Sequence, residues 1–112
     1  MFNFGAKKIP QISADEVKKA IEGKEDVFLL DVRTPGEYAD GKIQGSVNLS
    51  VDQVASKIVS LIPDKEKKIY VYCLSGSRST HAVDTMIKLG YRQVYNMTSG
   101  LLAWRIKRYT LV

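Results

Sequence analysis

The stretch Ile69-Tyr-Val-Tyr-Cys-Leu-Ser-Gly-Ser-Arg-Ser-Thr80 contains both the fold signal and the reactive chemistry of this chain. Its first four residues, Ile69–Tyr72, form a continuous apolar and aromatic run, which is typical of a strand buried on both faces of a sheet. The loop that follows holds the single cysteine, Cys73, and an arginine, Arg78. A helix starting near Ser79 completes the pattern. The stretch therefore predicts a strand, a tight loop and a helix N-terminus in succession.

The chain outside this stretch repeats the same alternation of strand and helix. Further strands are expected at 27–30, 47–49 and 94–96, and helices at about 14–22, after Ser50, near 79–89 and at 100–108, with a short helical turn starting at Thr34-Pro35. This alternation predicts an α/β fold with a mostly parallel sheet that helices cover on both faces. Ligands bind such sheets at the carboxyl ends of the strands, where both Asp31 and Cys73 fall.

Two expected helices begin at a capping signature. In this signature a serine stands before the helix, and a glutamate or glutamine stands three residues after the serine. Ser13 with Glu16 precedes the first helix, and Ser50 with Gln53 precedes a later one. The apolar residues of that later helix recur at helical spacing and form an expected buried stripe of Val54, Ile58, Leu61 and Ile62. The signatures therefore predict where both helices begin.

The composition is that of one domain spanning residues 1–112. The 112 residues are 45% hydrophobic and 26% charged, and a chain of this length buries roughly two thirds of its unfolded surface. Cys73 is the only cysteine, so neither an intramolecular disulfide nor a multi-thiolate metal site can form. We expect no metal and no cofactor, and Cys73 is either a core residue or a reactive one.

The charge balance favours anionic partners, because 17 lysines and arginines against 12 aspartates and glutamates give a net charge of +5. The lysines are spread over expected turns and helix faces without a nucleic-acid motif, so no nucleic-acid partner is expected. The apolar runs fall far short of the roughly 20 residues of a membrane span, and residues 1–5 lack the apolar core of a signal peptide. We expect a cytoplasmic protein that makes no membrane contact, with a monomer as the default.

The residues after Cys73 favour a thiolate at this position. A loop between a strand end and a helix N-terminus can turn its backbone N–H groups inward, and such a nest stabilises negative charge on sulfur. Gly76 allows the tight backbone path, and Arg78 adds a fixed charge with two donors for a sulfonate or phosphate oxygen. The other candidate site residues of the loop are Leu74, Ser75, Ser77 and Ser79. A cysteine that only fills the core has no need of such a loop.

A series of motifs extends over about residues 10–108. The motifs are Leu30-Asp-Val-Arg33, Glu37-Tyr38, Gly41-Lys-Ile-Gln-Gly45-Ser-Val-Asn-Leu49, Tyr72-Cys-Leu-Ser-Gly-Ser-Arg-Ser79, Gly90-Tyr91, Val94-Tyr95 and Ser99-Gly-Leu-Leu-Ala-Trp104. In order and spacing they resemble the rhodanese-like domain family, whose single-domain members are thiosulfate sulfurtransferases. The resemblance implies a five-stranded parallel sheet flanked by helices on both faces, with Cys73 as the nucleophile that carries sulfur.

The activity that the resemblance implies is sulfur transfer. The Cys73 thiolate would take the outer sulfur of thiosulfate, or that of a persulfide, and pass it through a Cys73 persulfide to a thiol or cyanide. The amides of residues 74–79 would stabilise the anionic sulfur, and Arg78 would orient the donor sulfonate and support the loop. The expected partners are therefore a small anionic sulfur donor and a thiol acceptor.

Two other functions stay open at this point. A domain with this loop can also be a persulfide carrier or partner-binding module that another protein loads. Cysteine-dependent phosphatases likewise use a cysteine, an amide cradle and an arginine. They have five residues between the cysteine and the arginine, whereas four separate Cys73 from Arg78 here. The smaller ring of amides fits one sulfur atom better than a phosphoryl group.

Three positions depart from the family pattern. Lys42 stands where the family usually has histidine, Gln44 stands where it usually has proline, and Ser99 precedes Gly100 where a Gly-Gly pair is common. The first two fall in an expected surface loop. Ser99 lies in a segment that the family places beside the active loop, so this departure bears on acceptor preference.

Three further residues receive structural rather than catalytic interpretations. His81 is expected to face solvent on the helix that follows the loop. Trp104 is expected to pack in the core. Arg33 is expected to pair with Glu37 or Asp31 rather than to contact a substrate.

Overall fold

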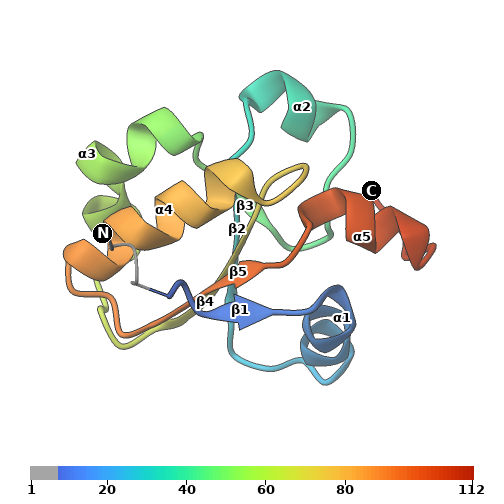
Figure 1. The fold of residues 1–112 in the computed structure, drawn as a ribbon, viewed down its shortest axis with the longest axis horizontal. Coiled ribbons are helices and arrows are strands. Elements are labelled where there is room, and N and C mark those ends of the chain that lie inside the picture. The colour runs from blue at the N-terminus through green and yellow to red at the C-terminus, as the bar shows by residue number, and fades with distance from the viewer. Residues whose placement is uncertain (1–7) are drawn as a thin grey trace.

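A computed structural model describes residues 8–112, in which strands and helices alternate along the chain (Figure 1). The strands are β1 (Gln11–Ile12), β2 (Phe28–Asp31), β3 (Val47–Asn48), β4 (Lys68–Tyr72) and β5 (Gln93–Met97). The helices are α1 (Ala14–Glu22), α2 (Pro35–Ala39), α3 (Val51–Leu61), α4 (Ser77–Lys88) and α5 (Gly100–Ile106). No helix within residues 8–112 is long and apolar enough to cross a bilayer.

The five strands form one parallel sheet in the order β1-β5-β4-β2-β3. The five-stranded parallel sheet that we predicted is therefore confirmed. β4 is central, and the chain moves outward from β2 to β3 on one side and from β4 to β5 on the other. In parallel α/β sheets the crevice at the carboxyl ends of the strands beside such a reversal is where ligands bind. The end of β4 occupies this place.

β4 is buried on both faces because its side chains alternate between two apolar cores. Ile69, Val71 and Cys73 pack in the core that includes residues of α3 and α4, whereas Tyr70 and Tyr72 pack in the core that includes residues of α1 and α5. These two pairs of helices accordingly cover opposite faces of the sheet (Figure 1). Cys73 thus leaves β4 on the face that α4 covers, directly before the loop that enters α4.

One of the two predicted capping boxes forms and the other does not. The Glu16 amide donates to Ser13 Oγ at 3.0 Å and the Ser13 amide donates to Glu16 Oε1 at 3.1 Å, so the first box is confirmed. Ser50 precedes α3, but the Gln53 amide bonds to its carbonyl instead of its side chain, so the second was wrong. The set of buried residues predicted for α3 was also too large. It included Leu61, which lies at the end of the helix and is 37% exposed.

The edge strand β1 was not predicted. Its two residues are not part of an apolar run, and they form a strand because Gln11 and Ile12 pair with Asn96 and Met97 of β5. The other elements lie within about two residues of their expected bounds. α4 begins two residues earlier than expected, so Arg78 belongs to its first turn rather than to the loop.

The N-terminus of α5 packs directly against the loop that follows β4. The amides of Leu101 and Leu102 donate to the carbonyls of Cys73 and Leu74 at 3.0 and 3.1 Å. This close approach requires Gly100, because a Cβ atom there would lie 2.3 Å from the Cys73 carbonyl oxygen. The φ angle of Gly100 is also left-handed, at +51°. α5 therefore fixes the backbone that carries Cys73.

We expect Gly100→Ala to destabilise the fold, because its methyl group collides with the loop carbonyls and its backbone is left-handed. The two effects should lower the free energy of unfolding by about 2 to 4 kcal/mol in urea denaturation. Gly36→Ala in α2 is the matched control, since no atom lies within 4 Å of a Cβ at that position. Alanine there should leave stability unchanged or raise it slightly. Equal losses in both variants would contradict this account of α5.

Candidate active site

Cys73 follows β4 at the carboxyl edge of the sheet, between β2 and β5. The loop after it lies between α2 and α5, as Figure 1 shows. Cys73 is 0% exposed. The fold thus places a buried thiol at the edge where parallel sheets bind their ligands.

Three polar groups surround Sγ of Cys73. The Gly76 amide lies 3.1 Å from it, and the amide and the hydroxyl of Ser79 each lie 3.4 Å away. Burial raises the pKa of the Cys73 thiol, but the hydrogen bonds from Ser79 and from the loop amides outweigh burial, so this pKa lies below its ordinary value. The loop can therefore hold a thiolate in a position shielded from bulk water.

Gly76 provides the turn that brings the loop amides back toward the sulfur. Its φ angle of +107° is left-handed, and a Cβ atom there would lie only 3.4 Å from the Ser99 nitrogen. Gly76 is also the N-cap of α4, and its carbonyl accepts hydrogen bonds from the amide and Oγ1 of Thr80 at 3.0 and 2.7 Å. These bonds lock the first turn of α4 to the loop, which holds the Ser79 amide toward Sγ.

Ser79 connects the sulfur to a buried polar network that the sequence analysis did not identify. Its hydroxyl bonds to Oδ1 of Asn96, which is 3% exposed in β5. Asn96 Nδ2 donates in turn to Gln11 Oε1 in β1 at 2.9 Å, so the Asn96 oxygen faces Ser79. Because a hydroxyl has one hydrogen, Asn96 Oδ1, the Gly76 carbonyl and a Cys73 thiolate compete for it. The sequence signal for this network was an amide side chain between Tyr95 and Met97 in β5.

Arg78 is held by Glu37 of α2. Its Nη1 donates to Oε1 at 2.7 Å and its Nη2 donates to Oε2 at 3.1 Å, while the Thr34 amide donates to Oε1 at 3.0 Å. The bonds from Arg78, aided by the Thr34 amide, lower the pKa of the Glu37 carboxyl to about 2. Because the Glu37 carboxylate holds the guanidinium in place and offsets its charge, this geometry favours the expected role of Arg78 in supporting the loop over direct binding of a sulfonate.

The predicted ion pair of Arg33 forms with Asp31 and not with Glu37. Arg33 Nε lies 3.1 and 3.0 Å from the two carboxylate oxygens of Asp31, and Nη2 lies 2.6 Å from Oδ2. Nη2 also donates to the Gly41 carbonyl at 2.7 Å. The pair is almost fully buried and ties the end of β2 to the segment that follows α2.

The side chains of the other loop residues named from the sequence supply no donor to the sulfur, although the Ser75 amide helps to lower the pKa of the thiol. Ser75 and Ser77 are exposed, and Leu74 is partly buried. The side-chain oxygens of these two serines make no hydrogen bond to Sγ within the described range. Gly76 and Ser79 therefore supply the closest donors to the sulfur.

Two residues flank the loop without bonding to the sulfur. His81 is exposed on α4, as expected for a histidine that faces solvent. Ser99 is the N-cap of α5, has a left-handed φ angle of +59°, and lies against Gly76. The Ser99 departure is therefore adjacent to the active loop, as the resemblance implied.

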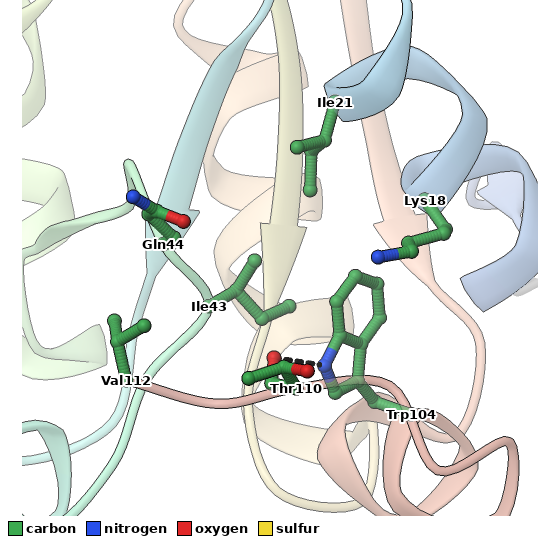
Figure 2. Close-up of a pocket in the computed structure, with 7 residues that line it drawn as sticks. All are labelled: Lys18, Ile21, Ile43, Gln44, Trp104, Thr110 and Val112. Atoms are coloured by element: carbon green, nitrogen blue, oxygen red, sulfur yellow. Dashed lines mark hydrogen bonds between the residues drawn. The ribbon is translucent and has the colours of Figure 1, made fainter.

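A small pocket lies on the side of the sheet that α1 and α5 cover, and Gln44 and Trp104 help to line it (Figure 2). Trp104 is 2% exposed, as expected for a core residue, and its Nε1 donates to the Thr110 carbonyl at 3.1 Å. None of the residues that line this pocket belongs to the loop after β4. Lys42 instead places its ammonium 4.7 Å from the centre of the Tyr38 ring. Neither the Lys42 nor the Gln44 departure therefore lies in the candidate site.

These features define a class of protein: a parallel α/β domain whose central strand ends in an anion-stabilising loop built around one cysteine. The family model of the rhodanese-like domain matches residues 13–107. The chain therefore belongs to the rhodanese-like domain family.

Individual relatives agree with this assignment. A sulfurtransferase of Allochromatium vinosum is 33% identical over 96 residues, which cover 86% of this chain and 88% of the relative. A putative mitochondrial thiosulfate sulfurtransferase of Schizosaccharomyces pombe is 37% identical over 102 residues, which cover 81% of this chain and 72% of the relative. The crystal structure of a rhodanese-related protein from Thermoplasma volcanium matches with a TM-score of 0.81 at 28% identity, over 92% of this chain and 97% of that one. Sulfur transfer in general is the chemistry that these relatives support.

Ser79→Ala should shift the titration of the Cys73 thiol to higher pH, because it removes a hydroxyl donor from the thiolate. A hydrogen bond to a charged group contributes about 1.5 kcal/mol, so the thiolate fraction below the midpoint should fall roughly tenfold. The measurement is thiolate absorbance in the ultraviolet against pH, for which Cys73 is the only thiol. Ser77→Ala, at an exposed position in the same turn, is the control and should leave the titration unchanged. A shift to lower pH in Ser79→Ala would refute this role.

The ion pair between Glu37 and Arg78 should make stability depend on pH in the acidic range. The pKa of Glu37 falls from 4.5 to about 2 on folding because Arg78 binds the carboxylate, so its contribution is full above about pH 5 and is lost as the pH falls toward 2. Both side chains are 34% exposed, and solvent screening limits the contribution to about 1 kcal/mol. The difference in unfolding free energy between wild type and Glu37→Gln should therefore shrink over this range. A difference independent of pH would show that Glu37 acts in another way.

Proposed function

We propose that this chain is a sulfurtransferase that moves sulfane sulfur from thiosulfate, or from a persulfide, to a thiol or cyanide through a Cys73 persulfide. The observation that carries this proposal is the buried Sγ of Cys73, which has three polar groups within 3.4 Å. Despite its burial, these hydrogen bonds keep the pKa of the thiol lowered. The nucleophile is therefore available as an anion without a separate general base.

In the first half-reaction the Cys73 thiolate attacks the outer sulfur of thiosulfate. A bond forms between Sγ and that sulfur, the sulfur–sulfur bond of thiosulfate breaks, and sulfite leaves with the bonding electron pair. The enzyme keeps a persulfide with one negative charge. The donors of the loop are fixed in place beforehand, so the nucleophile is held as an anion without any rearrangement of the loop.

In the second half-reaction a thiolate or cyanide attacks the terminal sulfur of the persulfide. The bond between the two sulfurs of the persulfide breaks, and Cys73 leaves as the thiolate that began the cycle. Atoms, electrons and charge balance over the two half-reactions, so the proposed cycle needs no cofactor.

The size of the loop supports sulfur transfer over phosphate hydrolysis. Four residues separate Cys73 from Arg78, one fewer than in cysteine phosphatases, and the shorter ring suits a single sulfur atom. Glu37 binds both terminal nitrogens of Arg78 and offsets its charge, which weakens the attraction of Arg78 for a phosphoryl group. The net charge of +5 also attracts a small anionic sulfur donor.

Cys73→Ser should keep the fold and lose sulfur transfer, because a serine hydroxyl cannot carry a sulfane sulfur. Wild-type protein treated with thiosulfate should gain the mass of one sulfur atom and release sulfite, whereas the variant should do neither. Intact mass and sulfite release are the measurements, with hydrolysis of p-nitrophenyl phosphate followed in parallel. Substantial turnover of thiosulfate by the serine variant would eliminate the mechanism.

The same assay separates the alternative functions. Sulfur uptake from a persulfidated protein but not from thiosulfate would indicate a carrier that another protein loads. Hydrolysis of p-nitrophenyl phosphate faster than consumption of thiosulfate would replace the proposal with a phosphatase.

A further inference from the structure

An open hollow lies beside the candidate active site. Its lining residues are Arg33, Glu37, Asp40, Gly41, Leu74 and Arg105. Leu74 directly follows Cys73, and α2 and α5 lie on either side of the loop (Figure 1). A molecule bound in the hollow would therefore lie next to the loop that holds the sulfur.

Much of the charge around this hollow is already neutralised. The Arg33 guanidinium and the Glu37 carboxylate are held in the two ion pairs described above. Asp40 and Arg105 are both exposed, and neither forms an ion pair with another residue of the range 8–112. The Asp40 carboxylate and the Arg105 guanidinium are therefore free to pair with a ligand in the hollow.

Arg33 supplies a further donor from an almost buried position. Its Nε and Nη2 bind Asp31 and the Gly41 carbonyl, whereas Nη1 makes no hydrogen bond within the described part of the chain. Arg33 is one of the residues that line the hollow, so Nη1 is its nitrogen that remains for a ligand there. Nη1 and the Arg105 guanidinium are therefore available as donors to a carboxylate bound in the hollow.

We propose that this hollow is the acceptor subsite, and that it takes a small thiol bearing both an ammonium and a carboxylate group. The inference rests on the proposed function, because it needs a persulfide on Cys73. The ligand carboxylate pairs with Arg105 and Arg33 Nη1, and the ligand ammonium pairs with Asp40. Thiosulfate matches the hollow less well, because a dianion is repelled by the free carboxylate of Asp40.

The chemical step from this subsite is the second half-reaction. The thiolate of the bound acceptor attacks the terminal sulfur of the Cys73 persulfide and forms a new sulfur–sulfur bond. The bond to Sγ breaks, and its electron pair returns to Sγ. Two anions react and two anions result, namely the acceptor persulfide and the Cys73 thiolate.

The two half-reactions, measured separately, test this assignment. Protein is loaded with thiosulfate, freed of small molecules and mixed with one of four thiols at a subsaturating concentration. L-cysteine carries both charged groups, 3-mercaptopropionate carries the carboxylate, cysteamine carries the ammonium, and 2-mercaptoethanol carries neither. Loss of the persulfide mass gives the discharge rate. Each variant is compared with wild type on the same thiol, so the intrinsic reactivities of the thiols cancel.

Asp40→Asn should slow discharge by about three- to fivefold for L-cysteine and cysteamine, and leave the other two thiols unaffected. Arg105→Gln should slow discharge to a similar degree for L-cysteine and 3-mercaptopropionate. The matched controls are Asp26→Asn and Arg92→Gln, which change the net charge equally near the amino ends of β2 and β5, away from the loop. Both controls should discharge to all four thiols at the wild-type rate.

Two outcomes would overturn the acceptor subsite. One is an equal effect of Asp40→Asn or Arg105→Gln on all four thiols, or the same pattern in the control variants. The other is a defect of Arg105→Gln in thiosulfate loading alone, which would assign the hollow to the donor. If wild-type protein takes up sulfur neither from thiosulfate nor from a persulfide, the proposed function itself fails, and this is seen before any acceptor is added.

Discussion

The arrangement of the candidate active site follows from one requirement, which is to hold the buried Sγ of Cys73 as an anion by hydrogen bonds. Burying a thiol disfavours its anion, and fixed donors are needed to reverse that effect. The Gly76 amide at 3.1 Å and the amide and hydroxyl of Ser79 at 3.4 Å provide them. Donors at such distances stabilise an anion only if they stay in place, so the loop must be held rigidly by its surroundings.

Three elements hold the loop and the first turn of α4 from outside, and each contacts a different part of them. α5 donates two amides to the loop carbonyls, α2 holds Arg78 through Glu37, and β5 contacts Ser79 through Asn96. These supports come from distant parts of the sequence. They converge because the parallel topology brings the carboxyl ends of β2, β4 and β5 to one edge of the sheet. The fold class thus explains why so short a loop can be so fully supported.

The local parts of this arrangement could be predicted from the sequence, and the long-range parts could not. The strand, loop and helix start within residues 69–80 have their own periodicity and turn signals. The ion pair of Glu37 and Arg78 joins residues 41 positions apart, and Asn96 reaches the loop only because β5 pairs with β4. β1 exists only through its pairing with β5. Sequence spacing therefore identifies the donors next to the cysteine, but not the elements that fix those donors.

The proposed mechanism assigns two tasks to two different parts of the site. A free thiolate holds its charge on Sγ, among the loop donors, whereas a persulfide holds it one sulfur–sulfur bond farther out, about 2 Å away. Loading therefore moves the charge away from donors that backbone geometry fixes. The surfaces next to the loop are made of side chains such as Asp40 and Arg105, which can change without disturbing the turn at Gly76. Proteins that share this loop can therefore differ in their acceptors, because the residues that recognise an acceptor are not those that stabilise the thiolate.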